Sequence, residues 1–228
     1  MVDLQDYGLN QECLYEVLAC TISKKDEIKY PNTASMGIRV LDDKSIKIKP
    51  YHNTQTHKNI IEYGRVSLNF IDDVALFAQA SLKVIKEDFS GIPIEDYLYY
   101  NYHYRGEGYN IPYLKQAWMV LFCNVVKETQ IVKQDNFGNI DLTEFELEII
   151  HSTKERESFK LYNRAENLAL ECIILATRLK IAKKKNDNML YLKIETKIKD
   201  YIEMITKFGR NSSVLRALNI VKDYIKLL

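Results

Sequence analysis

The sequence contains few of the residues that shape turns or cross-link small proteins. Its 228 residues include 8 glycines, 4 prolines and 4 cysteines. No two cysteines have CxxC spacing, and all lie in or beside apolar segments, so we expect buried free thiols rather than disulfides or metal ligands. These are Cys13, Cys20, Cys123 and Cys172. The 4 histidines are scattered without the spacing of metal ligands, so no metal site is predicted.

An excess of charge of one sign is also lacking. The 32 basic and 31 acidic residues leave a net charge of +1, so no basic field predicts a nucleic-acid partner. No apolar run is long enough to cross a membrane, and residues 1–10 are polar, unlike a signal peptide. We therefore expect a cytoplasmic protein with no membrane partner. With 46% hydrophobic and 28% charged residues, the composition is typical of a globular protein with a sizeable core.

The first part of the chain is predicted to be rich in strands. Ile46 and Ile48 alternate with Lys47 and Lys49, which is typical of a half-buried strand. Similar reasoning predicts strands over residues 14–23, 33–41, 45–49, 66–71 and 116–128. Short helices are predicted over 54–63 and 73–82, and Gly64 ends the first of them. Residues 94–113 are rich in tyrosine but lack a period, so we expect a long irregular excursion.

The second part of the chain is predicted to be helical. Thr143 with Glu146, and Asn163 with Glu166, have the spacing of a capping box. They predict helices over about 143–156 and 164–182. Two further amphipathic helices follow, one ending near residue 209 and the other beginning at residue 212 or 213. We therefore expect a β-rich domain over residues 1–138 and a helical subdomain over residues 139–228.

The segment most informative about chemistry runs from residue 31 to residue 70. It contains PNTASMG, a hairpin, and then KPYHNTQTHKNIIEYG, in which a strand ends and a helix begins. Amides at a helix start and the positive end of its dipole suit an anionic phosphate. Thr54, Thr56 and Asn59 add side-chain donors. The alternative is that Thr54 or Thr56 only caps the helix.

Other phosphate-binding folds are excluded by their missing motifs. The chain has neither GxGxxG nor the glycine-rich lysine loop, so Rossmann and P-loop folds are not predicted.

Two strings in this segment, PNTASMGIRV and THKNIIEYGRVSLNF, resemble the FMN-binding split-barrel superfamily of flavin reductases and pyridoxamine-phosphate-oxidase-like proteins. The whole chain is more similar to a mainly archaeal family, the domain of unknown function 447. A second motif, LYNRAENLALECIILATRL, resembles that family's helix, although Asn167 replaces a small residue. Ser35 stands where many relatives have proline. The matching positions in the first half are Asn32, Ala34, Met36, Gly37, Arg39, Thr54, Thr56, Asn59, Asn69, Phe70, Asp72, Asp73, Phe77 and Ala78.

The resemblance implies an α+β fold, mainly antiparallel β. This is an FMN-binding split β-barrel with a C-terminal helical subdomain, forming a homodimer with FMN near the subunit interface. It also implies that Thr33, Ala34, Ser35 and Met36 contact the flavin ring through their backbone amides, and that Thr54, Thr56 and Asn59 hold the phosphate.

The resemblance leaves other residues with two readings. His57 contacts the phosphate or lies on the helix surface. Arg39 reaches the phosphate or pairs with a surface acid, and Asn69 contacts the flavin or satisfies a turn. Asp72 and Asp73 have the look of paired catalytic carboxylates, but Asp73 is also a natural helix cap.

Several further side chains also have two possible roles. Asn163 and Glu166 are explained by capping, whereas Arg164 faces the cleft or pairs with an acid. His103 and Arg105 are substrate contacts or solvated loop residues. Aromatic residues stack on the ring or pack in the core; they are Trp118, Tyr99, Tyr100, Tyr102 and Tyr104.

The function implied is that of an FMN-binding flavoprotein, an oxidoreductase of the flavin reductase type using NAD(P)H. In such a protein the cofactor carries the redox chemistry, so no catalytic acid or base is expected. One alternative is a module that binds FMN without redox turnover. Another is an enzyme of cofactor metabolism that binds a different phosphorylated ligand in the same cleft.

Overall fold

The computed structural model describes residues 4–11, 14–83, 91–104, 106–135, 138–158, 163–208 and 212–228. Cys13 and Arg105 lie outside these residues, as does the predicted helix end near residue 209. The chain divides into two compact units. One comprises Met1–Ile71 and Pro93–Ser158, and the other Asp72–Ile92 and Phe159–Leu228.

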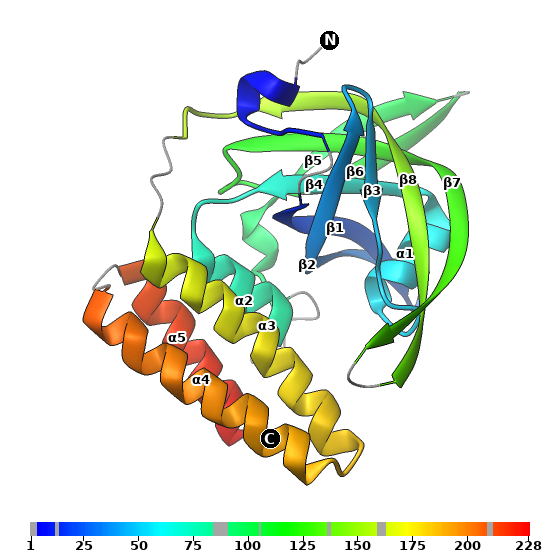
Figure 1. Ribbon diagram of the computed structural model, residues 1–228. Coiled ribbons are helices and arrows are strands. Elements are labelled where there is room, and N and C mark those ends of the chain that lie inside the picture. The colour runs from blue at the N-terminus through cyan, green and yellow to red at the C-terminus, as the bar shows by residue number, and fades with distance from the viewer. Residues whose placement is uncertain are drawn as a thin grey trace. The chain divides into compact units, whose positions relative to one another are not determined.

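The first unit is a closed antiparallel barrel with strand order β1-β2-β3-β8-β7-β4 (Figure 1). The strands are β1 (Leu14–Lys25), β2 (Ile28–Asp42), β3 (Ser45–Ile48), β4 (Arg65–Phe70), β7 (Met119–Asp135) and β8 (Gly138–Lys154). A short 3-10 helix, η1 (Leu4–Tyr7), precedes them, and α1 (Gln55–Tyr63) lies between β3 and β4 in the chain. The predicted antiparallel β-barrel and its β2–β3 hairpin are confirmed.

The barrel closes around side chains that alternate along each strand. On β2, Met36, Ile38 and Val40 are buried in the core, whereas Arg39 between them is exposed. This period of two is what a strand with one buried face requires. The core also receives Val17, Ala19, Ile46, Ile48, Leu68, Leu121, Phe145 and Leu147.

The helix predicted over 143–156 is wrong, because these residues belong to β8. Leu142, Phe145 and Leu147 are buried, whereas Glu148 is exposed, and β8 pairs with both β3 and β7. The alternation of a strand therefore prevails over the capping-box spacing of Thr143. The compact unit that holds the barrel runs to Ser158 and so includes β8.

The irregular excursion predicted over 94–113 is also wrong. After η2 (Ile94–Asp96), the chain forms a two-stranded sheet from β5 (Tyr97–Tyr104) and β6 (Glu107–Leu114). Two buried side chains of β4 hold this hairpin: Ser67 Oγ donates to Pro112 O at 2.5 Å, and Asn69 Oδ1 accepts from Leu114 N at 2.8 Å.

The second unit is helical, as predicted for the end of the chain. It contains α2 (Val74–Leu82), α3 (Arg164–Lys184), α4 (Asn188–Phe208) and α5 (Ser212–Lys226). The predicted cap is confirmed, because Asn163 Oδ1 accepts from Ala165 N at 3.0 Å and from Glu166 N at 3.3 Å. Among the described helices, none is both long and apolar enough to span a membrane.

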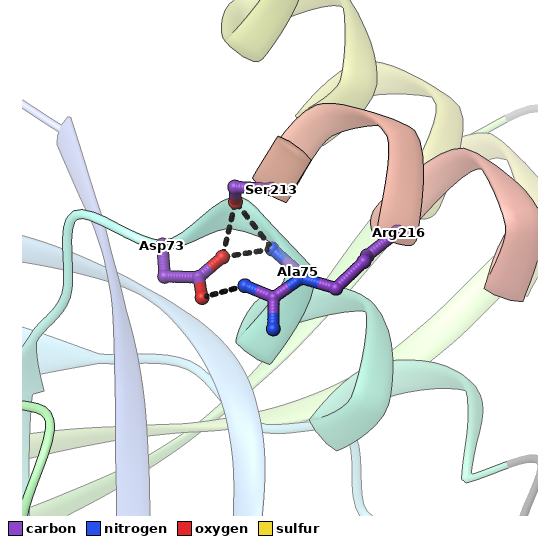
Figure 2. A network of polar contacts seen from close by, with 4 residues as sticks. All are labelled: Asp73, Ala75, Ser213 and Arg216. Atoms are coloured by element: carbon purple, nitrogen blue, oxygen red, sulfur yellow. Dashed lines mark hydrogen bonds and ion pairs between the residues drawn. The ribbon is translucent and has the colours of Figure 1, made fainter. Parts of the chain in front are cut away.

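Asp73 joins two helices of this unit, as Figure 2 shows. Its carboxylate caps α2 by accepting from Ala75 N at 2.9 Å, and it accepts a further bond from the hydroxyl of Ser213 at the start of α5. Arg216 pairs with the same carboxylate at 2.7 Å. The capping alternative for Asp73 is thus confirmed.

The cysteines that the structure describes are free thiols in the interior. They are Cys20, Cys123 and Cys172. Burial raises the pKa of Cys20 and of Cys172 to about 12, so neither forms a reactive thiolate at neutral pH. The prediction of buried free thiols is confirmed for these three residues.

Candidate functional site

The start of α1 provides backbone amides that no helical bond uses. Thr54 is the N-cap: its Oγ1 accepts from His57 N at 3.2 Å and donates to Tyr51 O at 2.8 Å. The first backbone bond runs from Lys58 N to Thr54 O at 3.2 Å. The amides of Gln55 and Thr56 precede it, and the described residues offer them no partner. Such a helix start attracts anions.

Strand β2 has one open edge beside this helix start. It pairs with β1 from Ile28 to Arg39, but β3 pairs with it only from Ile38 onward. No described strand therefore covers the second edge of residues 28–37, where alternate residues direct their backbone groups away from β1. The predicted ring contacts Thr33, Ala34, Ser35 and Met36 all belong to this stretch.

A buried polar network fixes α1 against β1 and β2. Asn32 Nδ2 donates to Thr56 Oγ1 at 3.2 Å and to Thr21 Oγ1 at 3.3 Å. Asn59 Nδ2 donates to Thr21 Oγ1 at 2.8 Å and to Ser23 Oγ at 2.9 Å. All of these side chains are buried. The network brings the helix start next to the open edge of β2, while Thr56 and Asn59 direct their own side chains inward.

Two histidines and a threonine lie beside the helix start. Thr143 Oγ1 is 2.7 Å from His52 Nε2 and 3.0 Å from His57 Nε2, and the two rings are 4.8 Å apart. Burial, and then the nearby His52, lower the pKa of His57 below its ordinary value. His57 is therefore neutral at neutral pH, and its ring supplies a polar contact rather than a charge.

A cavity of about 670 Å³ opens on the outer face of β2 and β3 and reaches Tyr51, which precedes α1. Met36, Gly37 and Arg39 of β2 line it, together with Lys47 and Lys49. Its size is in the range of small-molecule sites. At Gly37 a Cβ would lie 3.1 Å from Leu14 Cδ1, so this position leaves little room for a side chain.

The charge of the cavity is positive but partly balanced. Lys47 Nζ and Lys49 Nζ lie 2.9 Å and 2.8 Å from the two oxygens of Glu144. Hydrogen bonds from these ammonium groups lower the pKa of Glu144, so it stays ionised. Glu16 also lines the cavity, so with Arg39 three cations face two carboxylates, and the remaining excess of one positive charge suits an anionic ligand.

The predicted site residues fall into two groups. Met36 and Arg39 line the cavity, and Thr54, Thr56, His57 and Asn59 form the first turns of α1. Thr33 and Asn69 instead have fully buried side chains tied to the β5–β6 hairpin. Thr33 Oγ1 is 2.6 Å from Tyr97 Oη, and Asn69 Nδ2 donates to Leu18 O at 3.0 Å. Ala34 and Ser35 lie on β2 between Thr33 and Met36, and both are partly exposed.

Sequence reasoning missed Lys47, Lys49 and Tyr51 as parts of the site. The two lysines were noted only as the polar face of a strand. The signal was the hairpin register, because Arg39 lies directly opposite Lys47 across β2 and β3. In the part of the chain that the structure describes, no cluster of histidine, cysteine or acidic residues could hold a metal ion.

Comparison with known proteins finds relatives in sequence and in structure. The chain is 26% identical over 196 residues to the uncharacterized protein MJ1453 of Methanocaldococcus jannaschii, covering 83% of this chain and 92% of that one. A crystal structure of the FMN-bound protein MM1853 from Methanosarcina mazei matches with a TM-score of 0.72 at 19% identity, covering 97% of this chain and 100% of that one. The fold is therefore that of MM1853.

A family match covers most of the barrel. The family is described as the N-terminal domain of a protein of unknown function, DUF447, and it matches residues 15–156. This span begins in β1 and ends just after β8, so it contains the start of α1 and the open edge of β2. The chain therefore belongs to the DUF447 family.

Proposed function

We propose that the protein binds FMN at the junction between the start of α1 and the open edge of β2. The observation that carries the proposal is the Asn32–Thr56 hydrogen bond of 3.2 Å, which joins two sets of backbone donors at one place. Support also comes from the fold shared with MM1853, a protein described as FMN-bound. The excess of positive charge in the adjoining cavity favours the same ligand class.

In this proposal the phosphate is bound by the amides of Gln55 and Thr56, with Thr54 and His57 beside them. Arg39 faces the cavity from β2 and provides charge. Thr56 and Asn59 are positioning residues, since their side chains have partners inside the barrel. The backbone of Thr33–Met36 would face the polar edge of the ring, where amide donors stabilise negative charge on a reduced flavin.

A homodimer is part of the proposal. Large apolar side chains at the cavity are unusually exposed, with Leu14 at 60%, Tyr51 at 48% and Val132 at 68%. Such a patch beside a binding site is typical of a surface that a partner covers. A second copy would bury these side chains and enclose the flavin. Light scattering after size exclusion should give twice the mass of 26.7 kDa.

The redox role is the finer part of the proposal. A bound flavin supplies hydride chemistry with a nicotinamide cofactor, and the residues of this chain would bind and orient it. Purified protein that is yellow and bleaches with NADH or NADPH supports an oxidoreductase. Yellow protein that is inert to both is a binding module instead. Colourless protein that ignores added FMN contradicts FMN binding and favours another phosphorylated ligand.

Two variants of Gln55 test the proposed phosphate site directly. Proline is tolerated at the first position of a helix and lacks an N–H, so Gln55→Pro removes one proposed donor while the helix remains. Gln55→Ala is the matched control, since both variants lose the bond from Gln55 Nε2 to Asn59 Oδ1 but alanine keeps the amide.

The readout is the ratio of FMN affinity to riboflavin affinity, because riboflavin lacks the phosphate. We expect Gln55→Pro to weaken FMN about tenfold, as losing a charge-assisted hydrogen bond implies, and to leave riboflavin unchanged. Gln55→Ala should leave the ratio at the wild-type value. An unchanged ratio in Gln55→Pro, with circular dichroism confirming the fold, would place the phosphate elsewhere.

A further inference from the structure

A second cavity, of about 310 Å³, lies where the β5–β6 hairpin meets the ends of β1, α1 and β4. Its lining includes the rings of Tyr63, Tyr99 and Tyr109 together with the cationic side chains of Lys29 and Arg65. It shares no lining residue with the cavity beside Arg39. It is therefore a separate cavity from the one at the proposed FMN site.

Arg65 is held in a fixed position in this cavity. Its guanidinium carbon lies 3.3 Å from the centroid of the Tyr109 ring, and Nη1 donates to Tyr63 O at 2.9 Å. Its Nε is buried, and among the described residues it has no hydrogen-bond partner. The protein therefore satisfies this guanidinium only in part, and an anion in the cavity would pair with its charge.

The charged side chains that line the cavity are those of Lys29 and Arg65, and carboxylates lie behind its tyrosines. No carboxylate lines it. Glu107 accepts a hydrogen bond from the hydroxyl of Tyr109, and this bond raises the pKa of that tyrosine. The neighbouring Glu62 raises the pKa of Tyr63 to about 12, and burial raises that of Tyr99. The three rings thus stay neutral, while Lys29 and Arg65 carry positive charge.

The remaining lining is of mixed polarity, with Gly108 and Asn110 beside three apolar residues. Ile22, Ile111 and Pro112 add to the tyrosine rings, which favour stacking with another ring. The volume is at the lower end of the range for small-molecule sites, which suits a single ring rather than a dinucleotide. A compact ligand with an aromatic face and one acidic group would use both the rings and the guanidinium.

We propose that this cavity, defined by Arg65, Lys29 and the tyrosines Tyr63, Tyr99 and Tyr109, is a binding site for a small aromatic acid. The acidic group would pair with the guanidinium of Arg65, and the ring would lie among the tyrosines. The site would serve as a substrate or effector site on the barrel unit. It does not depend on the proposed flavin site.

Benzoate is the probe, with neutral benzamide as its isostere, in titrations followed by calorimetry. We expect saturable binding of benzoate, and binding of benzamide that is weaker by about tenfold or more, because the charge-assisted bond is lost. Phenyl phosphate in the same titration shows whether a phosphate or a carboxylate is preferred. If neither acid binds saturably, or if benzamide binds as well as benzoate, the proposal is wrong.

Variants locate the binding. Arg65→Ala should weaken benzoate about tenfold or more, whereas Lys115→Ala, an exposed cation just after β6, should not change it. Tyr99 has a 45% exposed side chain, so Tyr99→Ala should fold and weaken benzoate severalfold even if Arg65→Ala does not fold. Unchanged affinity in Tyr99→Ala, or displacement of benzoate by FMN, would overturn the assignment.

Discussion

The side-chain amide of Asn32 donates to Thr56 Oγ1 at 3.2 Å, across 24 residues of sequence. One residue lies on the open edge of β2, and the other lies in the first turn of α1. Both side chains are buried, so the bond is protected from water and fixes the helix start against the strand. The two segments that the sequence suggested for ring and phosphate are thus neighbours.

Thr56→Val removes the acceptor of this bond without changing the volume of the side chain. Asn32 Nδ2 keeps its bond to Thr21, so we expect a loss of about 1 kcal/mol in the free energy of unfolding, the usual value of one hydrogen bond. FMN affinity should fall severalfold as the helix start loosens. Urea unfolding and flavin titration provide the measurements.

Thr206→Val is the matched control, because the Thr206 hydroxyl donates to Glu203 O on the exposed face of α4. We expect its stability to stay within about 0.5 kcal/mol of the wild type and its flavin affinity to be unchanged. Equal stability of the two variants would contradict the role given to the Asn32–Thr56 bond.

The lowered pKa of His57 predicts that the stability of the folded protein depends on pH. Its pKa in the folded protein is lowered below the ordinary 6.5, so the folded state resists a proton that the unfolded state accepts. Its contribution to stability is therefore complete above pH 6.5 and is lost as the pH falls below that value. His57→Gln cannot titrate, so the difference in unfolding free energy between pH 8 and pH 5 should be smaller in this variant. His103→Gln, on an exposed residue of β5, is the control. A variant as pH-dependent as the wild type would refute the effect.

The contacts of Asp73 predict that its removal destabilises the helical unit alone. Asp73→Ala removes the cap of α2 and the partner of Ser213 and Arg216, so we expect a loss of about 1 to 2 kcal/mol. Arg216 is exposed, with 63% of its side chain accessible, so Arg216→Ala should cost less than about 1 kcal/mol. Thermal unfolding compares the two. A loss in Arg216→Ala as large as in Asp73→Ala would mean that the ion pair, not the cap, matters.

Sequence patterns predicted the fold where local signals agreed. Several local patterns each indicated an element that the structure contains: the alternation over residues 45–49, the predicted hairpin, and the cap residues Thr54, Asp73 and Asn163. The patterns failed at Thr143, where two residues with capping-box spacing lie on a strand. The pairing of β8 with β3 and β7 outweighs local propensity, and such long-range pairing is not encoded in a short window.

The candidate site was predictable only in part. The helix start at Thr54 has a local signature, whereas the open edge of β2 depends on where β3 ends its pairing, at Ile38. The inward direction of Asn59 depends on Thr21 and Ser23, which lie 38 and 36 residues away. The cavity beside Met36 requires Lys49, which follows β3, and Leu142 of β8. These are tertiary relationships, and a single sequence gives no direct signal for them.

A variant of Asn69 distinguishes a structural role for this residue from a contact with the ligand. Its Oδ1 accepts from Leu114 N at 2.8 Å, and its Nδ2 donates to Leu18 O at 3.0 Å, so Asn69→Ala leaves two buried backbone groups without these bonds. We expect a loss of about 2 kcal/mol or more in unfolding free energy, with FMN affinity of the folded protein changed less than about twofold. The control is Asn124→Ala, because Asn124 Oδ1 is buried without a partner among the described residues and its Nδ2 makes only a 3.5 Å contact with Tyr102 Oη. Asn124→Ala should lower the free energy of unfolding by less than Asn69→Ala does. A tenfold loss of FMN affinity in stable Asn69→Ala would instead make Asn69 a flavin contact.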